Sequence, residues 1–347
     1  MQSNRVPALF AGLLLAIAST TYGAASPSAP EKPSATVKED DATYRQLQEA
    51  AGAVVSVRTK ALGNARSSAN LGTDRTGSGI LIAPSGLVLT IGYLILEADQ
   101  VEVTDSSGRS LPASVVAYDH ATGFGLLRPI GRLSPKPIVL GASGAVEQLD
   151  RLMIASGGEG GVSVATVVSR RTFAGYWEYL IDGAIFTSPP RVDHSGAALI
   201  NMAGELVGIG SLFVMDAMTP GQRLPGNMFV PIDLLKPILA EMIETGRQKA
   251  GRRPWLGVSC IEDEGRLKVL RVSADGPADK AGIRSGDIIL AIGGEKVRDL
   301  PDFYRRLWTS GEPGVEVGLT VLQGVDLKDL RIRSMDRIDL LRRKPTI

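Results

Sequence analysis

Short apolar runs separated by turn residues dominate the first two thirds of this chain. Each run is rich in β-branched residues or alternates apolar with polar ones, and both patterns are typical of strands. Strands do not alternate regularly with helical segments, which argues against a doubly wound parallel sheet. The pattern therefore predicts a mainly β domain whose hairpins close into barrels or sandwiches. The runs lie at residues 53–58, 78–82, 87–90, 101–103, 114–117, 125–128, 151–154, 163–168 and 206–210.

The pattern changes near residue 230, where Pro231 opens a predicted helix that ends at Gly246. A basic, polar run follows and is typical of a solvated linker. After it, predicted strands and one helix at 300–308 form a unit of the size of a small α+β domain. A short predicted helix at 40–51 opens the first domain. The predicted boundaries are 40–246 for the first domain, 247–253 for the linker, 254–338 for the second domain and 339–347 for a tail.

The first residues have the pattern of a secretory signal peptide. Arg5 precedes an apolar run at 6–18, and the small residues at 23–25 follow at the usual distance for cleavage. The run is too short to span a bilayer. We therefore expect residues 1–25 to be removed, leaving a Pro- and Ser-rich linker at 26–39 on an exported chain with no stable membrane span. An uncleaved anchor or a buried core helix is the alternative.

Composition excludes several classes of function. The formal net charge is +1, so no basic field indicates binding to nucleic acid. Cys260 is the single cysteine, so an exported chain has no internal disulfide. No cluster of His, Cys and carboxylates has metal-ligand spacing, and no glycine loop with a following lysine could hold a phosphate. We therefore predict neither a metal nor a cofactor.

One loop has the residue pattern of a serine nucleophile. The run Ser195–Asn201 (SGAALIN) is followed by Gly204–Gly208 (GELVG). With other segments in order, it resembles the HtrA/Deg family of exported trypsin-like serine proteases that carry C-terminal PDZ domains. The resemblance covers roughly residues 40–337 and implies a trypsin-like double β-barrel followed by one PDZ domain. The other segments that carry it are 77–82, 86–90, 119–127, 228–232 and 255–258.

The resemblance places unexpected residues at the catalytic positions. Tyr93 stands where the family has its histidine, and Gly123 where it has its aspartate. A phenol with a pKa of about 10 is a poor general base at neutral pH, and glycine has no carboxylate. Asp193 replaces the glycine of the oxyanion loop; it tolerates a left-handed backbone, but its charge has the wrong sign beside an oxyanion. Ser195 is therefore expected to be a retained but inactive nucleophile.

The chain has two histidines, His120 and His194, and neither stands at the family's position for the base. His120 lies in a predicted turn before Gly123, where a hydrogen-bonded or solvent-facing ring is usual. His194 is adjacent to Ser195, and neighbouring residues on a loop usually point their side chains apart. An active serine endopeptidase that uses His194 or His120 as a displaced base is the alternative hypothesis.

The start of the second domain carries the more specific part of the resemblance. Trp255, Leu256, Gly257 and Val258 match the family's apolar-Leu-Gly-apolar loop, whose N–H groups bind the C-terminal carboxylate of a peptide. Glycine lets the backbone approach the ligand, and clustered amides form an anion-binding nest. An extended peptide would add as a strand after this loop, with the helix at 300–308 as the other wall. A groove that serves only intramolecular or oligomer contacts is the alternative.

Together these features predict a non-catalytic HtrA-like protein in the periplasm or another exported location. It would bind peptides or protein C-termini as an adaptor, a chaperone-like factor or a regulator of an active relative in envelope protein quality control. By resemblance, the segment around Tyr44 could support a homotrimer, with a monomer as the alternative. A third hypothesis is an interaction module with a purely structural barrel and a closed groove.

Overall fold

The computed structural model describes residues 35–247 and 252–342. The predicted signal peptide at 1–25 lies outside these residues, as does most of the predicted linker at 26–39, so both stay predictions. Within the two described ranges, no helix is both long enough and apolar enough to cross a membrane.

The chain separates into two compact units, residues 1–40 and 41–347. The described part of the first unit is the beginning of helix α1 (Ala35–Gly52), which starts earlier than the helix predicted at 40–51. In the second unit α1 leads directly into the first strand, and Tyr44 is exposed on it. All other elements belong to the second unit.

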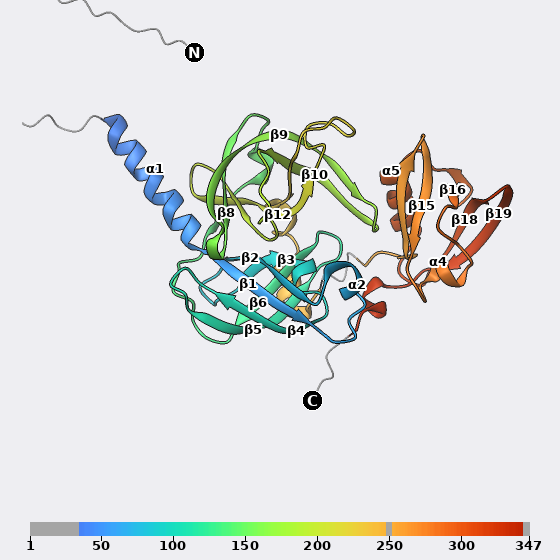
Figure 1. Ribbon diagram of the computed structural model, residues 1–347, viewed down its shortest axis with the longest axis horizontal. Coiled ribbons are helices and arrows are strands. Elements are labelled where there is room, and N and C mark those ends of the chain that lie inside the picture. The colour runs from blue at the N-terminus through green and yellow to red at the C-terminus, as the bar shows by residue number, and fades with distance from the viewer. Residues whose placement is uncertain (1–34, 248–251, 343–347) are drawn as a thin grey trace, which may run out of the picture. The chain divides into compact units, whose positions relative to one another are not determined.

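Six strands of the second unit form a closed antiparallel barrel in the order β1-β2-β3-β6-β5-β4 (Figure 1). Alternate residues face inward: Val57 and Val103 pair across β1 and β4, and both are fully buried. The strands are β1 (Val54–Ala61), β2 (Asp74–Leu81), β3 (Val88–Ile91), β4 (Ala98–Thr104), β5 (Ser110–Tyr118) and β6 (Phe124–Pro129).

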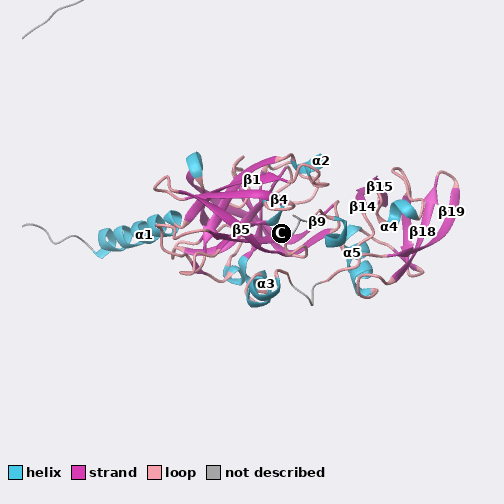
Figure 2. Cartoon of the chain, turned by 90° about the horizontal axis from the view of Figure 1, so that it is seen from below, coloured by secondary structure: helices cyan, strands magenta, loops and turns pink. Residues whose placement is uncertain are grey.

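Seven further strands form a second sheet in the order β11-β8-β9-β10-β13-β12-β7, and an additional pairing of β11 with β12 closes it on itself. Strands dominate both barrels (Figure 2). The double barrel therefore confirms the predicted architecture. The strands are β7 (Val139–Leu140), β8 (Arg151–Ser156), β9 (Gly161–Gly175), β10 (Tyr179–Ser188), β11 (Ala198–Ile200), β12 (Glu205–Val214) and β13 (Gly226–Pro231).

Strands β9 and β10 form a long hairpin that the sequence predicted only in part. The sequence pattern does not predict β10, because Asp182 and Gly183 in its middle resemble a turn. In the structure these residues form an irregularity between Ile181 and Ala184, with Gly183 at φ +66°. The strand pairing resumes beyond this bulge. The tip of the hairpin is the short turn 176–178.

The remaining residues form the predicted α+β domain, with a sheet in the order β14-β15-β16-β18-β19 and β17 beside β16. It has its own apolar core, which includes Phe303 and Tyr304 of the helix α5. The elements are β14 (Val258–Asp263), β15 (Arg266–Val272), α4 (Pro277–Lys280), β16 (Ile288–Ile292), β17 (Glu295–Lys296), α5 (Leu300–Thr309), β18 (Glu316–Gln323), β19 (Asp326–Arg333) and the 3-10 turn η5 (Arg337–Leu340).

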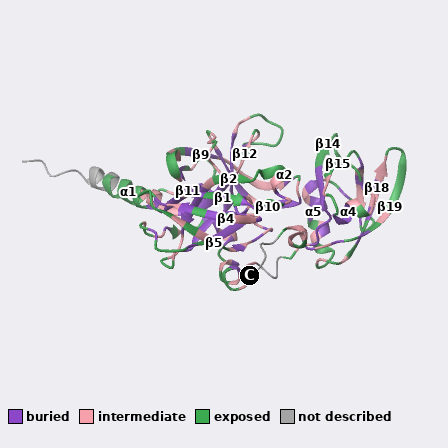
Figure 3. Cartoon of the chain, turned by 60° about the horizontal axis from the view of Figure 1, so that its bottom comes forward, coloured by how far each residue is buried: buried purple, intermediate pink, exposed green. Residues whose placement is uncertain are grey.

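Buried side chains line the strands of both barrels (Figure 3). The predicted helix at 231–246 is in fact interrupted: a 3-10 turn η4 (Ile232–Leu234) precedes α3 (Leu239–Thr245), which ends at Gly246 with φ +77°. The other short elements are α2 (Ser68–Leu71), η1 (Gly92–Leu94), η2 (Ser143–Ala145) and η3 (Gly158–Gly160).

Candidate functional site

Ser195 lies in the turn between β10 and β11, against the first barrel. Its carbonyl accepts a hydrogen bond from the Ser78 N–H of β2 at 2.8 Å. Gly196 follows with φ +73°, and a Cβ at this position would lie 2.1 Å from the Ser78 carbonyl oxygen. Only glycine therefore fits this turn without a backbone shift. The loop is fixed in one shape where the two barrels meet.

Tyr93 is the hydrogen-bonding partner of the Ser195 hydroxyl. It lies in η1, and its Oη is 2.8 Å from Ser195 Oγ and 2.8 Å from the Ser211 carbonyl oxygen. The carbonyl can only accept, whereas the serine hydroxyl can accept or donate. Burial raises the pKa of Tyr93 above its ordinary value of 10.0. The phenol therefore keeps its proton at neutral pH and cannot accept one from the serine.

Gly123 brings no side chain to this site, and a tyrosine occupies the space beside it. Gly123 has φ +80°, and a Cβ there would lie 3.0 Å from Tyr179 Oη. The Tyr179 hydroxyl donates to the Thr122 carbonyl at 2.8 Å, which fixes the ring. Sequence reasoning missed Tyr179, because it lies on β10, 57 residues after Thr122.

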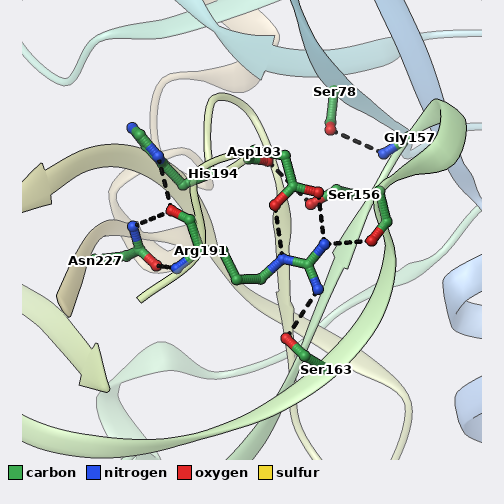
Figure 4. Close-up of polar contacts among 9 residues, drawn as sticks. Ser78, Ser156, Gly157, Ser163, Arg191, Asp193, His194 and Asn227 are labelled. Carbon is green, nitrogen blue, oxygen red and sulfur yellow. Dashed lines mark hydrogen bonds and ion pairs between the residues drawn. The ribbon is translucent and has the colours of Figure 1, made fainter. Parts of the chain in front are cut away.

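Neither histidine hydrogen-bonds Ser195 within the described ranges. His194 Nδ1 lies 3.1 Å from the Arg191 carbonyl oxygen (Figure 4). His120 packs against Tyr118 with ring centroids 4.2 Å apart, and both its ring nitrogens are buried without a hydrogen-bond partner among the described residues. The prediction of a hydrogen-bonded or solvent-facing His120 is therefore wrong. Burial lowers the pKa of both histidines, so both rings are neutral at pH 7.

The carboxylate of Asp193 is paired with Arg191 (Figure 4). Arg191 Nε donates to Asp193 Oδ1 at 2.9 Å, and Nη2 donates to Oδ2 and to the Gly160 carbonyl. Nη1 donates to Ser163 Oγ at 2.9 Å. Partial burial opposes ionisation, but the hydrogen bonds from Arg191 lower the pKa of Asp193 overall. The negative charge predicted beside the serine is therefore balanced by a cation that sequence reasoning missed.

The backbone at Asp193 is not left-handed, although aspartate would allow that conformation. Its carbonyl accepts a hydrogen bond from Ser156 Oγ at 3.0 Å. The loop therefore lacks, at this residue, the conformation for which glycine is needed. Within the described chain, the residues other than glycine with positive φ are Glu97, Leu149, Glu178, Glu264 and Asp275.

The predicted nest in the second domain converges on one carboxylate. The N–H groups of Gly257 and Val258 donate to Glu178 Oε1 at 2.7 and 3.0 Å, and Leu256 N–H donates to Oε2 at 3.3 Å. Gly257 has φ +82°, and a Cβ there would lie 2.9 Å from the Trp255 ring. The sequence located the donors but missed Glu178, which precedes Leu256 by 78 residues.

These two sites have different chemical capacities. At Ser195, the side chain in hydrogen-bond contact with the hydroxyl is a phenol that stays neutral at pH 7. At residues 256–258, three amides converge on a carboxylate, which is the chemistry of an anion-binding nest. In the part of the chain that the structure describes, no group of three or more His, Cys, Asp or Glu residues could hold a metal ion.

Comparisons with known proteins identify the two regions that contain these sites. Residues 77–209 match the model of a trypsin-like peptidase domain, and residues 254–333 match that of a PDZ domain. The chain is similar to the serine endoprotease DegS of Haemophilus influenzae, with 30% identity over 79% of this chain and 82% of that protein. It is also similar to the serine protease Do-like HtrA of Lactobacillus helveticus, with 28% identity over 76% of this chain and 69% of that protein.

Solved structures show the same fold. The HtrA-type protease AlgW with a decapeptide has a TM-score of 0.53 and 23% identity, covering 87% of this chain and 99% of that one. A serine endoprotease from Yersinia pestis has a TM-score of 0.51 and 23% identity, covering 88% of this chain and 99% of that one. The likeness extends across both barrels and the PDZ domain.

Proposed function

Because this chain belongs to the HtrA family, we propose that it binds the C-terminal ends of peptides or proteins through its PDZ domain without cleaving them. In this proposal Ser195 is a retained but inactive nucleophile. Tyr93, Gly123 and Asp193 stand where active members have histidine, aspartate and glycine. The observation that carries the non-catalytic half is the 2.8 Å contact between Tyr93 Oη and Ser195 Oγ, where an active site needs an imidazole.

The size of the expected fall in catalytic rate supports a non-catalytic role. A serine nucleophile needs a base to take its proton and a carboxylate to orient that base. Loss of triad members lowers the rate by roughly 10⁴-fold to 10⁶-fold, and the effects do not add, because these residues act as a unit. Tyr93 stays protonated because burial raises its pKa, and Gly123 has no carboxylate. Proteolysis is therefore expected at background level.

The binding half rests on the geometry of the nest and the neighbouring strand. Three amides converge on a carboxylate position, as recognition of a peptide C-terminus requires. Strand β14 follows directly and offers backbone groups for an added strand, while α5 supplies a wall of buried side chains. The similar HtrA-type protease AlgW was solved with a decapeptide.

The proposed cellular role is that of an adaptor, a chaperone-like factor or a regulator of an active relative in envelope protein quality control. Export is supported by the sequence pattern at 1–25 and by similar proteins that are named as probable periplasmic endoproteases, such as that of Brucella suis, half of whose length this chain spans. Homotrimer formation through α1 is supported by Tyr44, whose side chain is 62% exposed on that helix.

The proposed binding is tested by fluorescence polarisation with a library of labelled C-terminal peptides. Each peptide is compared with its C-terminal amide, because an amide lacks the charge that the nest selects. We expect a subset of free-acid peptides to bind and their amides to bind at least about tenfold more weakly, since hydrogen bonds to charged groups contribute more. A library without any binder, or equal binding of acid and amide, would contradict the proposal.

A further inference from the structure

The tip of the β9–β10 hairpin contacts the PDZ domain through the features that a bound peptide C-terminus would use. We infer that Glu178 is an internal ligand of this domain: its side-chain carboxylate occupies the nest of residues 256–258, and an external C-terminal peptide must displace it. The inference rests on the proposed peptide-binding function and adds regulation to it. Three independent sets of contacts carry it.

The first set is the carboxylate itself. Glu178 Oε1 accepts from Gly257 and Val258 at 2.7 and 3.0 Å, and Oε2 accepts from Leu256 at 3.3 Å. Glu178 is 6% exposed, so water competes little for these bonds. Both carboxylate oxygens therefore take up backbone donors that a peptide α-carboxylate would need.

The second set is a backbone hydrogen bond between the tip and β14. The Tyr176 carbonyl accepts a hydrogen bond from the Cys260 N–H at 2.9 Å, and the Glu178 carboxylate accepts one from the Val258 N–H at 3.0 Å. As the residue number rises along the tip, the partner's number falls along β14, so the two segments run antiparallel. The tip thus lies along the edge of β14 where the sequence predicts a peptide to bind, in the direction of an antiparallel added strand.

The third set involves the helix wall and an apolar side chain. The Tyr304 hydroxyl of α5 donates to the Gly175 carbonyl at 2.7 Å and accepts from the Glu178 N–H at 3.0 Å. Leu180, two residues past the carboxylate, is buried in the apolar core of the PDZ domain with Leu256. A carboxylate, a strand and an apolar side chain are the elements of C-terminal recognition, here supplied by a continuous chain.

The backbone of Glu178 shows how an internal segment can imitate a chain end. Its φ is +57°, a left-handed conformation that is uncommon for residues other than glycine. From this residue the main chain continues directly into β10, while the side chain reaches the amides of Gly257 and Val258. Such strain persists only where surrounding contacts fix it, and it is common at functional sites.

Occupation of the nest by Glu178 should weaken the binding of an external peptide by a calculable factor. When only a fraction of molecules has an open groove, the apparent dissociation constant rises by the inverse of that fraction. Removal of the internal carboxylate should therefore tighten binding of an external one. The matching ligand is a peptide with a free C-terminus and an apolar last residue, because one residue would then supply both the Glu178 carboxylate and the Leu180 side chain.

The probe for this test is a fluorescein-labelled peptide Ala-Gly-Tyr-Trp-Leu with a free C-terminus. It repeats the tip sequence 174–177 and has its C-terminal leucine at the position of Glu178. Its C-terminal amide is the control ligand. The full chain is compared with Glu178→Ala and with Glu178→Gln, which keeps an oxygen acceptor at the nest. Glu264→Ala is the matched control variant, since Glu264 is an exposed glutamate with φ +50° at the tip of a different hairpin, β14–β15, within the PDZ domain.

We expect Glu178→Ala to bind the free-acid probe at least about tenfold more tightly than wild type, with Glu178→Gln between them and Glu264→Ala unchanged. Equal affinity of wild type and Glu178→Ala for an acid-selective probe would overturn the inference while leaving the proposed function intact. Acid and amide bound equally, or a probe bound by no variant, would contradict the proposed function instead.

A second measurement tests the inference without any ligand. Amide hydrogen exchange at Gly257 and Val258 is followed by NMR in wild type and Glu178→Ala. Because Glu178 accepts hydrogen bonds from both N–H groups, these amides should exchange at least about tenfold faster in the variant. The exchange rates of the β19 amides should stay unchanged. Unchanged exchange at both nest amides in a folded variant would overturn the inference.

Discussion

Glu178 and Tyr179 are adjacent in the chain, yet their side chains end in different domains. The Glu178 carboxylate meets the amides of Gly257 and Val258 in the PDZ domain, whereas the Tyr179 hydroxyl donates to the Thr122 carbonyl in the first barrel. One turn of the hairpin therefore contacts both the amides of Gly257 and Val258 and the loop that precedes Gly123.

The contact of Tyr179 with Gly123 predicts a specific instability. Gly123→Ala should destabilise the protein more than Gly86→Ala, although both glycines are left-handed, with φ +80° and +85°. A Cβ at Gly123 would lie 3.0 Å from Tyr179 Oη, whereas nothing lies within 4 Å at Gly86. We expect an additional cost of about 1 kcal/mol from this crowding. Urea unfolding measures both variants, and equal costs would show that Tyr179 moves aside freely.

The hydrogen bonds of Tyr93 predict that this side chain contributes to stability. Tyr93→Phe removes the phenolic oxygen that contacts Ser195 Oγ and the Ser211 carbonyl, and leaves the half-buried hydroxyl and the carbonyl of buried Ser211 without that partner. The free energy of unfolding should fall by about 1–3 kcal/mol. Tyr44→Phe is the control, because the Tyr44 hydroxyl is exposed and its loss should change stability by less than about 0.5 kcal/mol. Equal effects in urea unfolding would contradict the structural role of Tyr93.

Glu178 predicts a pH dependence of peptide binding. Burial raises the pKa of Glu178 from 4.5 to about 7. The hydrogen bonds from Val258 and Gly257 and the charge of Arg337 lower this pKa, but burial outweighs them. Between these two values the docked carboxyl holds a proton that the released one lacks, so a rise in pH favours release. A peptide α-carboxyl, with a pKa of about 3.5, stays ionised. Wild type should therefore bind the free-acid probe more tightly at about pH 7.5 than at about pH 5.

The Glu178→Ala variant is the control for this pH dependence. Cys260 of β14, Tyr304 of α5 and Arg337 of η5 face Glu178, and all three remain in the variant. The tightening between pH 5 and 7.5 should disappear in Glu178→Ala and persist in Glu264→Ala. A dependence retained in Glu178→Ala would assign it to other groups. Besides Glu178 and Arg337, the charged and titratable residues that line the adjoining pocket are Tyr118, Asp119, His120, Arg247, Arg252, Arg253 and Asp336.

Local patterns were sufficient to predict the barrels and the PDZ domain. Gly196 and Gly257 both have positive φ and no room for a side chain, so their motifs encode backbone shape directly. The sequence spacing assigned Tyr93 to the position of the base, which stays a prediction; in the structure its hydroxyl contacts Ser195 Oγ. These signals lie within a few residues of the groups that they describe.

Long-range partners were not predictable from the sequence. Glu178 and Leu256 are 78 residues apart, and no local pattern marks a glutamate that will occupy an amide nest. The pairing of Arg191 with Asp193 is local, but the loop geometry that permits it depends on Gly160 and Ser163, far earlier in the chain. The sequence predicted a hydrogen-bonded or solvent-facing His120 wrongly, because the imidazole packs against the Tyr118 ring.

The most direct test of the central claim is covalent labelling of Ser195 by a fluorophosphonate, measured by intact-protein mass spectrometry with trypsin labelled in parallel. The probe reacts with a serine only when a base and an oxyanion site activate it. Because Ser195 Oγ contacts a protonated phenol, the wild-type protein should keep its unmodified mass while trypsin is labelled completely. An adduct on wild type that disappears in Ser195→Ala would contradict the account.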